Sequence, residues 1–465
     1  MKKLLGIFTV VVCLGTVLYA QPGPPPASTT INAFSIESWQ FSISWQPFNE
    51  ADGYVVVRSS SAITDEPTDG VIYDAGAPLG QAKVMYVGNA SGCVIREVVA
   101  DQEYFLKIYP YKDQNGSPNY FTDTVYLGNV TSGDGTPGDY YDAIDDGSSS
   151  FVMDLTALLS NHLTLGYYPF TSDYADIFLQ RDTTGVDKVI NCQYSNELIF
   201  FDEDFSDAGT GYNREHRMPR SWMNFNNFSS SEMQNSAEGA DYHGLAVIKG
   251  EVNSSRSNYA YGEVTGNPWS GSYIDYTKGQ DYRGITVAEP RDDRKGDCAR
   301  ALMYMMVTYN GKYSRNWGMD NLISRASDQE LSVLLQWHAQ DPPDAFEIAR
   351  NDFIASIQGS RNPFVDFPEW VDCIDFSNVS MKTECIDPST SIDGVSGDLM
   401  IPNPIYDNHI LLPHSVDEWQ ILTPSGQTVL KGNNVYIQLT ELSTGLYQLV
   451  TRKDGQVASK GILIP

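Results

Sequence analysis

Basic residues are few in this sequence. Its 465 residues include 30 lysines and arginines but 59 aspartates and glutamates, which gives a formal net charge of −29. A chain with this balance does not attract nucleic acid through its overall charge, because phosphate backbones are held by cations. The composition therefore argues against binding of nucleic acid unless a local group of basic residues provides it.

Long apolar stretches are also scarce, and the clearest one lies at the N-terminus. Residues 4–18 are apolar, follow Lys2 and Lys3, and end at Leu18-Tyr19-Ala20, which supplies a small-residue cleavage site. This run is too short and wrongly flanked for a dependable membrane span. We therefore predict that residues 1–20 are a signal peptide and that the mature protein is soluble, exported and not stably inserted in a membrane.

Cysteine is rare, and the C-x-x-C pairs that are typical of thiolate zinc sites are absent. Of the six cysteines, Cys13 falls in the signal peptide and five remain in the mature chain. An exported protein can form disulfides, and the odd number leaves at least one thiol unpaired. Cys373 and Cys385 are close enough in sequence to bridge.

The N-terminal third of the chain has the pattern of a β-sandwich. Short alternating or apolar runs, separated by turn residues, lie at Phe41–Trp45, Tyr54–Arg58 and Tyr104–Tyr109. The order of the aromatic residues in these runs resembles a fibronectin type III domain, which we place at residues 27–134. We find no cluster of catalytic residue types in this part.

The central part of the chain has a different pattern. Apolar residues at helical spacing predict helices at Leu155–Leu159, Asp297–Tyr309, Asp328–His338 and Ala345–Gln358. We therefore expect a mixed α/β domain at residues 139–376, which is large enough to bury a core of its own.

Strands return at the C-terminus and predict a small β-sandwich at residues 395–465. Four short runs are separated by turn residues: Trp419–Leu422, Thr428–Leu430, Val435–Leu439 and Leu446–Val450. Hairpin turns are expected at Pro424–Gly426 and Lys453–Gly455.

Two motifs of this C-terminal part point to its role. They are Pro402-Asn403-Pro404 and Thr444-Gly445-Leu446-Tyr447, and together they resemble a type IX secretion sorting domain. The resemblance implies secretion or display at the cell surface, with the export machinery as a partner. A plain β-sandwich binding module is the alternative.

The residues best suited to chemistry lie in the central domain. Glu215 and His216 are adjacent, and Asn253 follows in the run Gly250–Asn258. Hydrolysis of a phosphodiester needs a base for water and positive charge on the phosphate. The ordinary pKa of histidine, near 6.5, lets His216 act as a base at neutral pH. The oxygens of Glu215 and Asn253 suit Mg²⁺, which prefers hard ligands and keeps several waters.

Because Glu215 and His216 are adjacent, they can act on one phosphate only in certain backbone conformations. In an extended strand Glu215 and His216 point to opposite faces, so both reach one phosphate only if the backbone turns there. Pro219 fits such a turn, and Asn253 can lie on a helix that faces back toward the strand.

Several motifs in this region occur in one order. Arg214-Glu215-His216 is followed by Asp241-x-His243, by Glu251-Val-Asn253 and by Arg256-Ser-Asn258. With further matches downstream, from Lys295 to Pro363, this order resembles the endonuclease I family of ββα-metal (His-Me finger) nucleases. One residue departs from the family pattern, because Gly244 stands where the family usually has asparagine.

The resemblance implies the roles of individual residues. His216 is the expected general base, and Glu215 and Asn253 are the expected ligands of Mg²⁺, with Mn²⁺ or Ca²⁺ as alternatives. Arg256 is a candidate catalytic residue that either binds phosphate or holds its loop. The implied activity is that of a nonspecific endonuclease, which cuts DNA, and often RNA, to products with 5′-phosphates.

Other polar residues have competing interpretations. His243 is expected to orient the fold by hydrogen bonding, and His162 and His338 to serve packing or the surface. Basic residues at 214–220 and 291–300 are the expected phosphate contacts, among them Arg214, Arg217 and Arg220. Asn253 can also cap a helix.

The predicted architecture is therefore multidomain, with an α/β (ββα-metal) nuclease domain between a fibronectin III-like β-sandwich and a small C-terminal β-sandwich. Two other functions fit the same sequence. One is a surface adhesin or carbohydrate-binding protein whose nuclease-like domain is inactive, and the other is a hydrolase of a different phosphodiester, such as a lipid or a small nucleotide.

Overall fold

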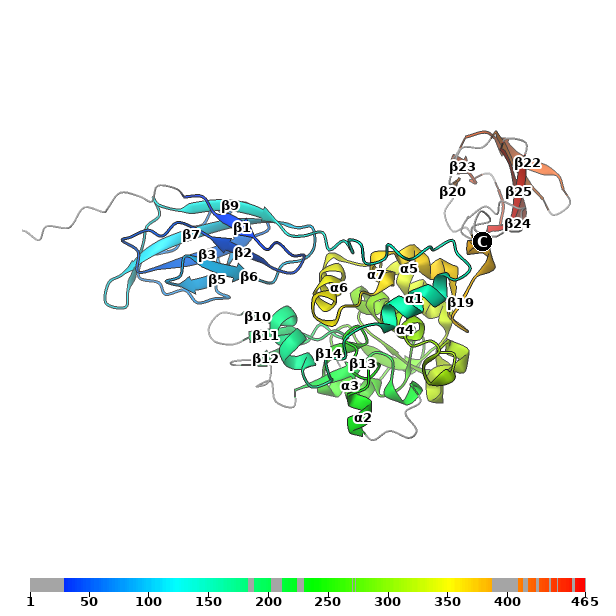
Figure 1. Ribbon diagram of the computed structural model, residues 1–465, viewed down its shortest axis with the longest axis horizontal. Coiled ribbons are helices and arrows are strands. Elements are labelled where there is room, and N and C mark those ends of the chain that lie inside the picture. Colours follow the sequence, from blue (N-terminus) through cyan, green and yellow to red (C-terminus); the bar gives the residue numbers. More distant parts are fainter. Residues whose placement is uncertain are drawn as a thin grey trace, which may run out of the picture. The chain divides into compact units, whose positions relative to one another are not determined.

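The structure is a computed structural model (Figure 1). It describes residues 29–182, 188–201, 211–223, 230–269, 271, 273–386, 409–412, 417–423, 426–434, 436–440, 442–453 and 456–464. The predicted signal peptide, the motif at 402–404 and most residues of the two predicted C-terminal turns lie outside these ranges.

The chain divides into two compact units. One contains Phe41–Ile95 and Glu103–Thr131 together with the preceding residues to Ser35, and the other contains Ile36–Gln40, Arg96–Gln102 and Ser132–Pro465. Each unit has its own buried core.

The first unit consists of β-strands in two sheets (Figure 1, blue and cyan). The larger sheet has the order β4-β5-β3-β7-β8 with β9 paired to β7, and the smaller has the order β1-β2-β6. The strands are β1 (Asn32–Phe34), β2 (Phe41–Ser44), β3 (Gly53–Ser59), β4 (Pro78–Leu79), β5 (Ala82–Gly88), β6 (Gly92–Ile95), β7 (Glu103–Asp113), β8 (Pro118–Tyr120) and β9 (Tyr126–Thr131). The three strands predicted from alternation are confirmed as β2, β3 and β7.

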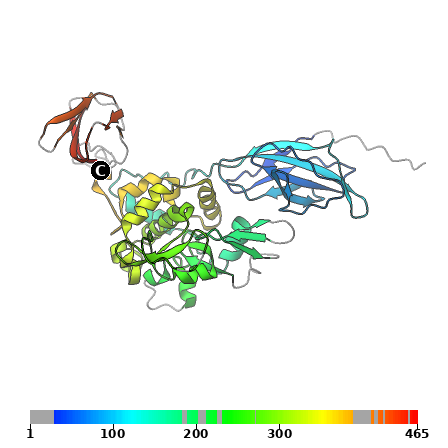
Figure 2. The same cartoon turned by 180° about the vertical axis from the view of Figure 1, so that it is seen from behind.

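The second unit is organised around one buried helix (Figures 1 and 2). All 14 residues of α4 (Lys295–Thr308) are buried. The helices α1 (Phe151–Ser160), α5 (Leu331–Gln340) and α7 (Pro363–Asp366) pack against it. A helix enclosed on all sides needs apolar or small residues around its whole circumference, which Cys298-Ala-Arg-Ala-Leu-Met-Tyr-Met-Met-Val307 largely provides.

The predicted helices are confirmed, with shifts at some ends. The predicted helix at 345–358 is α6 (Ala345–Gln358), which Asp344 caps by accepting a hydrogen bond from the Glu347 amide. It stops at Gly359, whose φ of 82° is the left-handed conformation that favours glycine. The helix predicted from Asp328 begins only at Leu331, because Glu330 has extended backbone.

Short sheets surround this helical core. The remaining helices and strands are α2 (Ser230–Gln234), α3 (Gly250–Arg256), β10 (Arg181–Asp182), β11 (Lys188–Asn191), β12 (Leu198–Phe201), β13 (Tyr212–His216), β14 (Leu245–Lys249), β15 (Ala260–Tyr261), β16 (Thr277–Gln280), β17 (Thr286–Glu289), β18 (Ile374–Asp375) and β19 (Ser380–Met381). A π-helical segment, η1 (Thr171–Leu179), and several short 3₁₀ segments connect them. Cys373 and Cys385, which are close enough in sequence to bridge, form a disulfide.

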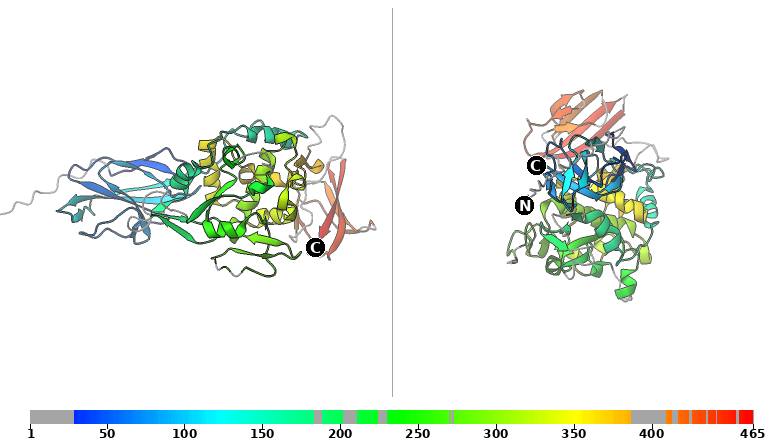
Figure 3. Two further views of the ribbon diagram at one scale, coloured as in Figure 1. Left: turned by 90° about the horizontal axis from the view of Figure 1, so that it is seen from below. Right: turned by 90° about the vertical axis from the view of Figure 1, so that its left-hand side faces the viewer.

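The C-terminal strands, coloured orange and red in Figure 3, form two small sheets. Strands β22-β21-β24-β25 make one sheet and β20-β23 make the other. Their bounds are β20 (His409–Leu411), β21 (Glu418–Leu422), β22 (Thr428–Gly432), β23 (Tyr436–Gln438), β24 (Gly445–Lys453) and β25 (Gln456–Ile464). Trp419, Ile421, Ile437 and Leu449 are among the residues of their common core. Among the described helices of the whole chain, none has the length and apolar character needed to cross a bilayer.

Candidate active site

Two strands and one helix bring the predicted site residues together. Strands β13 and β14 pair antiparallel, with Glu215 opposite Ala246 and His216 opposite Leu245. Helix α3 starts at Gly250, directly after β14 ends at Lys249. Because the chain reverses so tightly, α3 packs back on β13, the strand that carries Glu215 and His216.

A cavity of about 850 Å³ opens at this place and is lined by all four predicted site residues. They are Glu215, His216, Asn253 and Arg256. The other lining residues are Tyr167, Asn213, Arg214, Pro219, Arg220, Ser221, Ser257, Asn258 and Ile323. The expected turn is present, since β13 ends at His216 and a short 3₁₀ segment, η3 (Arg220–Trp222), follows Pro219. Both adjacent side chains therefore line one cavity.

The ring of His216 is fixed by two contacts. Its Nε2 lies 2.7 Å from the carbonyl oxygen of Gly239. Its face stacks on Tyr167, with ring centroids 5.2 Å apart and planes 3° from parallel. A carbonyl can only accept, so Nε2 carries the proton and Nδ1 of the neutral ring keeps its lone pair.

The environment of His216 also sets its charge. The side chain is buried, and burial lowers its pKa to about 4, while the contact with Gly239 acts in the opposite direction. The imidazole is therefore neutral at pH 7, and Nδ1 is available to accept a proton.

Glu215 is a buried carboxylate with a cationic neighbour. Its Oε1 accepts a hydrogen bond from Arg256 Nη1 at 2.8 Å and a longer one from the Tyr194 hydroxyl at 3.5 Å. Burial raises the pKa of Glu215 to about 7, and the charge of Arg256 acts against that rise. The backbone N–H of His216 also acts to lower this pKa, and the carboxylate lines the cavity, where it can meet a ligand.

The Arg256 guanidinium is occupied by protein oxygens. Besides Glu215, it donates to the carbonyl of His216 at 3.3 Å and to that of Arg217 at 2.6 Å. The side chain is 1% exposed and lies over the ring of Tyr261. These contacts tie α3 to the end of β13.

Asn253 supplies the second hard oxygen at the cavity. It is half-buried, and its side-chain amide makes no hydrogen bond to any described residue. No group of three or more His, Cys, Asp or Glu residues in the described part of the chain could hold a metal ion. One carboxylate and one amide oxygen at the same cavity suit a cation such as Mg²⁺, which fills its other positions with water and substrate.

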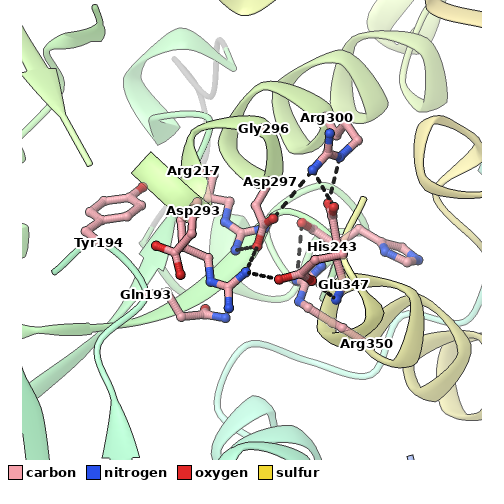
Figure 4. Close-up of polar contacts among 12 residues, drawn as sticks. Gln193, Tyr194, Arg217, His243, Asp293, Gly296, Asp297, Arg300, Glu347 and Arg350 are labelled. Carbon is pink, nitrogen blue, oxygen red and sulfur yellow. Dashed lines mark hydrogen bonds and ion pairs between the residues drawn. The ribbon is translucent and has the colours of Figure 1, made fainter. Parts of the chain in front are cut away.

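The structure corrects part of the prediction about basic residues. Arg217 is 1% exposed and faces Asp297 at 3.9 Å, so it does not reach the cavity (Figure 4). Arg214 lies over Tyr167 and Tyr168, 5.0 Å from each ring centroid. Arg220 is exposed and lines the cavity.

The predicted basic cluster at 291–300 is not a surface for phosphate either. Its basic residues are Arg291, Arg294, Lys295 and Arg300, and each is less than 10% exposed. Their partners are carboxylates: Asp293 for Arg291, Asp297 and Asp344 for Arg294, Glu289 for Lys295 and Glu347 for Arg300. Figure 4 shows Asp297 between Arg217 and Arg300. The positive charges that lie close together in the sequence at 291–300 are thus neutralised by carboxylates inside the fold.

Asp241 and His243 have the structural role that the sequence suggested for His243. Nε2 of His243 lies 2.9 Å from the carbonyl of Ser360. Asp241 accepts hydrogen bonds from Tyr304 and Tyr309 at 3.0 and 2.8 Å. These contacts fix the loop that leads into β14.

Gly244 lies close to the buried helix α4. A Cβ atom at this position would lie 2.9 Å from the sulfur of Met305. The asparagine of the family pattern would therefore require the Met305 side chain to shift.

His162 and His338 serve packing, as expected. Nε2 of His162 lies 2.9 Å from the Tyr309 hydroxyl, and Nε2 of His338 lies 3.0 Å from the carbonyl of Pro368. Two tyrosines of the site, Tyr167 and Tyr194, were not predicted. They reach the site from loops distant in sequence, and no local signal marks them.

Comparison with known proteins gives a consistent result for this region. The family described as Endonuclease I matches residues 149–369. The extracellular ribonuclease of Bacillus amyloliquefaciens is 31% identical over 238 residues, which are 50% of this chain and 76% of the relative. That of Bacillus subtilis (strain 168) is 31% identical over 261 residues, 55% of this chain and 80% of the relative.

Other similarities cover less of the chain. An extracellular deoxyribonuclease of Aeromonas hydrophila is 32% identical over 143 residues, 30% of this chain and 54% of the relative. A solution structure of a human fibronectin type III domain aligns with 26% of this chain and 88% of its own, at 17% identity and a TM-score of 0.16. A score this low does not establish a shared fold.

Proposed function

Because the chain belongs to the endonuclease I family, we propose that it is an exported, metal-dependent endonuclease with little sequence preference. Its substrates are DNA and also RNA, and its products carry 5′-phosphates. One observation carries the proposal: three suitable groups line the same cavity. They are the neutral, oriented imidazole of His216 and the hard oxygen donors of Glu215 and Asn253.

In this proposal His216 is the general base. Nδ1 takes a proton from a water molecule, and the water oxygen attacks phosphorus in line with the 3′ oxygen. The bond from phosphorus to the 3′ oxygen breaks, and this oxygen takes a proton from solvent water, which leaves a 5′-phosphate and a 3′-hydroxyl. The Gly239 carbonyl, which already accepts from Nε2–H, stabilises the imidazolium that forms. The Tyr167 stack holds the ring in plane during this transfer.

Glu215 and Asn253 are the proposed ligands of Mg²⁺, with Mn²⁺ or Ca²⁺ as alternatives. When bound, the cation supplies positive charge to the phosphoryl oxygens and to the leaving oxygen. Arg256 is proposed as a positioning residue, because its guanidinium holds Glu215 and two carbonyls of the turn and is not free for phosphate.

We further propose the roles of the flanking segments. Residues 1–20 direct export as a signal peptide, and residues 395–465 serve as a type IX secretion sorting domain, so the enzyme is secreted or held at the cell surface. Residues 27–134 form a fibronectin III-like module, and residues 139–376 form the nuclease. The supporting observations are the sequence motifs and the separate β and mixed α/β cores.

The proposed activity is tested with the mature full-length chain. Supercoiled plasmid and single-stranded RNA are each incubated with Mg²⁺, with EDTA, and with EDTA followed by excess Mg²⁺. Cutting that EDTA abolishes and Mg²⁺ restores, with 5′-phosphate ends on the products, is the expected result. Absence of cutting across pH and divalent metals would instead favour an adhesin with an inactive nuclease-like domain.

A further inference from the structure

Some basic side chains of the second unit pair with carboxylates, whereas others contact aromatic rings. Away from the cavity, several lie within 4 Å of carboxylates, as in the pairs Arg283–Asp281, Lys295–Glu289 and Arg361–Asp366. Lys278 and Arg325 differ, because within the described residues their recorded side-chain contacts are with aromatic rings. An aromatic ring holds a cation in place without cancelling its charge.

Lys278 and Arg325 form a continuous row with the two aromatic residues that they contact, Tyr259 and Trp269. The guanidinium carbon of Arg325 lies 4.4 Å from the centroid of the Tyr259 ring. Nζ of Lys278 lies 5.4 Å from the same centroid and 5.2 Å from the centroid of Trp269. Arg325 is exposed, and Tyr259, Trp269 and Lys278 are half-buried, so the row is partly open to solvent.

This row lies next to the cavity that holds Glu215 and His216. Asn258 lines the cavity and directly precedes Tyr259, while Ile323 lines it two residues before Arg325. The 3₁₀ segment η7 (Ser324–Asp328), which carries Arg325, packs against η3. That segment carries Arg220, the exposed cation of the cavity. The cations of the row therefore belong to segments that adjoin the lining of the cavity.

We propose that Tyr259, Trp269, Lys278 and Arg325 form a phosphate-binding subsite that holds the substrate strand just outside the cavity. The inference rests on the proposed nuclease function and names a part of its substrate binding. In a chain with a net charge of −29, affinity for a nucleic acid strand depends on local cations that are not neutralised. Lys278 and Arg325 meet this condition, and the buried cations at 291–300 do not.

The chemistry of the subsite limits what it recognises. Cations bind the phosphates of any sequence, so the subsite adds affinity without sequence preference. The subsite binds phosphates next to the one that is cut. Only a substrate with more than one phosphodiester can therefore contact it. On a single strand, each phosphate contact that is lost lowers the slope of log Kd against log[salt] by about 0.7.

The test compares a long and a short substrate with the double variant Lys278→Gln/Arg325→Gln. We expect the KM for a single-stranded oligonucleotide of about twenty nucleotides to rise roughly tenfold with little change in kcat. Bis(p-nitrophenyl) phosphate has no neighbouring phosphate, so kcat/KM for it stays within about twofold. The charge-retaining variant Lys278→Arg/Arg325→Lys should keep most of the affinity for the oligonucleotide.

Direct binding separates this inference from the nuclease proposal. With EDTA present, fluorescence anisotropy of the labelled oligonucleotide should show roughly tenfold weaker binding by the double variant and a slope of log Kd against log[salt] that is lower by about 1.4. Lys107→Gln is the control, since Lys107 also lies over a tyrosine, Tyr109, but belongs to the first unit. Equal binding by wild type and double variant, or equal losses on both substrates, would overturn the subsite. Absence of cleavage with this binding difference intact would overturn only the nuclease.

Discussion

At the scale of single residues, neighbours prepare two adjacent side chains for different tasks. Burial keeps His216 neutral, and the Gly239 carbonyl decides which ring nitrogen carries the proton. Glu215 is equally buried, which raises its pKa to about 7, and Arg256, 2.8 Å away, acts against this rise and favours the charged form. One residue is thus suited to accept a proton and the other to bind a cation.

Removing one proposed ligand should weaken metal binding without disturbing the fold. For Asn253→Ala we expect the Mg²⁺ concentration for half-maximal cutting to rise roughly 10–100-fold, because even supporting residues of metal sites matter this much. Titration of plasmid cutting with Mg²⁺ measures it. Asn258→Ala is the matched control, since Asn258 lines the same cavity but bonds Ser221. Equal Mg²⁺ requirements in both variants would argue against Asn253 as a ligand.

A pH effect on stability is expected at Asp241. Burial raises its pKa, but the charges of His162 and His243 and the hydrogen bonds from Gln358 and Tyr309 outweigh burial, and the net pKa is below the ordinary value. A lowered pKa stabilises the fold above the unfolded value of about 3.9, and this stability is lost as pH falls through the folded pKa. The stability gap between wild type and Asp241→Asn should therefore narrow as the pH falls below about 4. Denaturant unfolding at several pH values measures the gap, and a gap that widens toward acid would contradict the assignment.

At the scale of elements, the site depends on tight connections. Helix α3 follows β14 without a loop, and β13 ends at His216, so both sides of the cavity are fixed by backbone pairing. Ala246 and Ile248 of β14 share a core with residues of the buried helix α4 and with Val252 of α3. Elements this closely joined leave few ways for the site residues to separate.

The end of α6 offers a prediction at this scale. Gly359 has a φ of 82°, and a Cβ atom there would meet nothing within 4 Å. Gly359→Ala should therefore cost about 1 kcal/mol through backbone strain alone. Gly266 has equally open space and no positive φ, so Gly266→Ala is the control and should change stability by less than about 0.5 kcal/mol. Chemical unfolding of both variants checks the difference, and equal losses would contradict the strain argument.

At the scale of the whole molecule, the spacing of apolar residues predicted the structure better than the runs of basic residues did. Alternation and helical spacing predicted β2, β3, β7, α1, α4 and α6, because these patterns report burial directly. The order of motifs brought Glu215, His216, Asn253 and Arg256 to attention before the cavity was known. The same sequence misplaced the phosphate contacts, since a run of arginines does not reveal partners such as Asp297 and Glu347 that are distant in sequence.

The disulfide between Cys373 and Cys385 gives a prediction for the stability of the molecule. It closes a loop with a sequence separation of 12, and constraining the unfolded chain over such a loop is worth about 3 kcal/mol. Cys373→Ser/Cys385→Ser should lower the thermal midpoint by several degrees, and dithiothreitol should do the same to the wild type. If dithiothreitol lowers the thermal midpoint of the double variant as much as that of the wild type, the loss of stability does not come from this disulfide.

The central claim is that His216 is the base of a phosphodiester hydrolase. Its most direct test is the single-turnover rate of plasmid cutting by His216→Ala in saturating Mg²⁺, with His338→Ala as control because His338 does not line the cavity and contacts the carbonyl of Pro368. We predict that His216→Ala loses roughly 10²–10⁴-fold in rate while its circular dichroism spectrum is unchanged. A rate within about tenfold of the control would contradict the claim, because a general base contributes more than this.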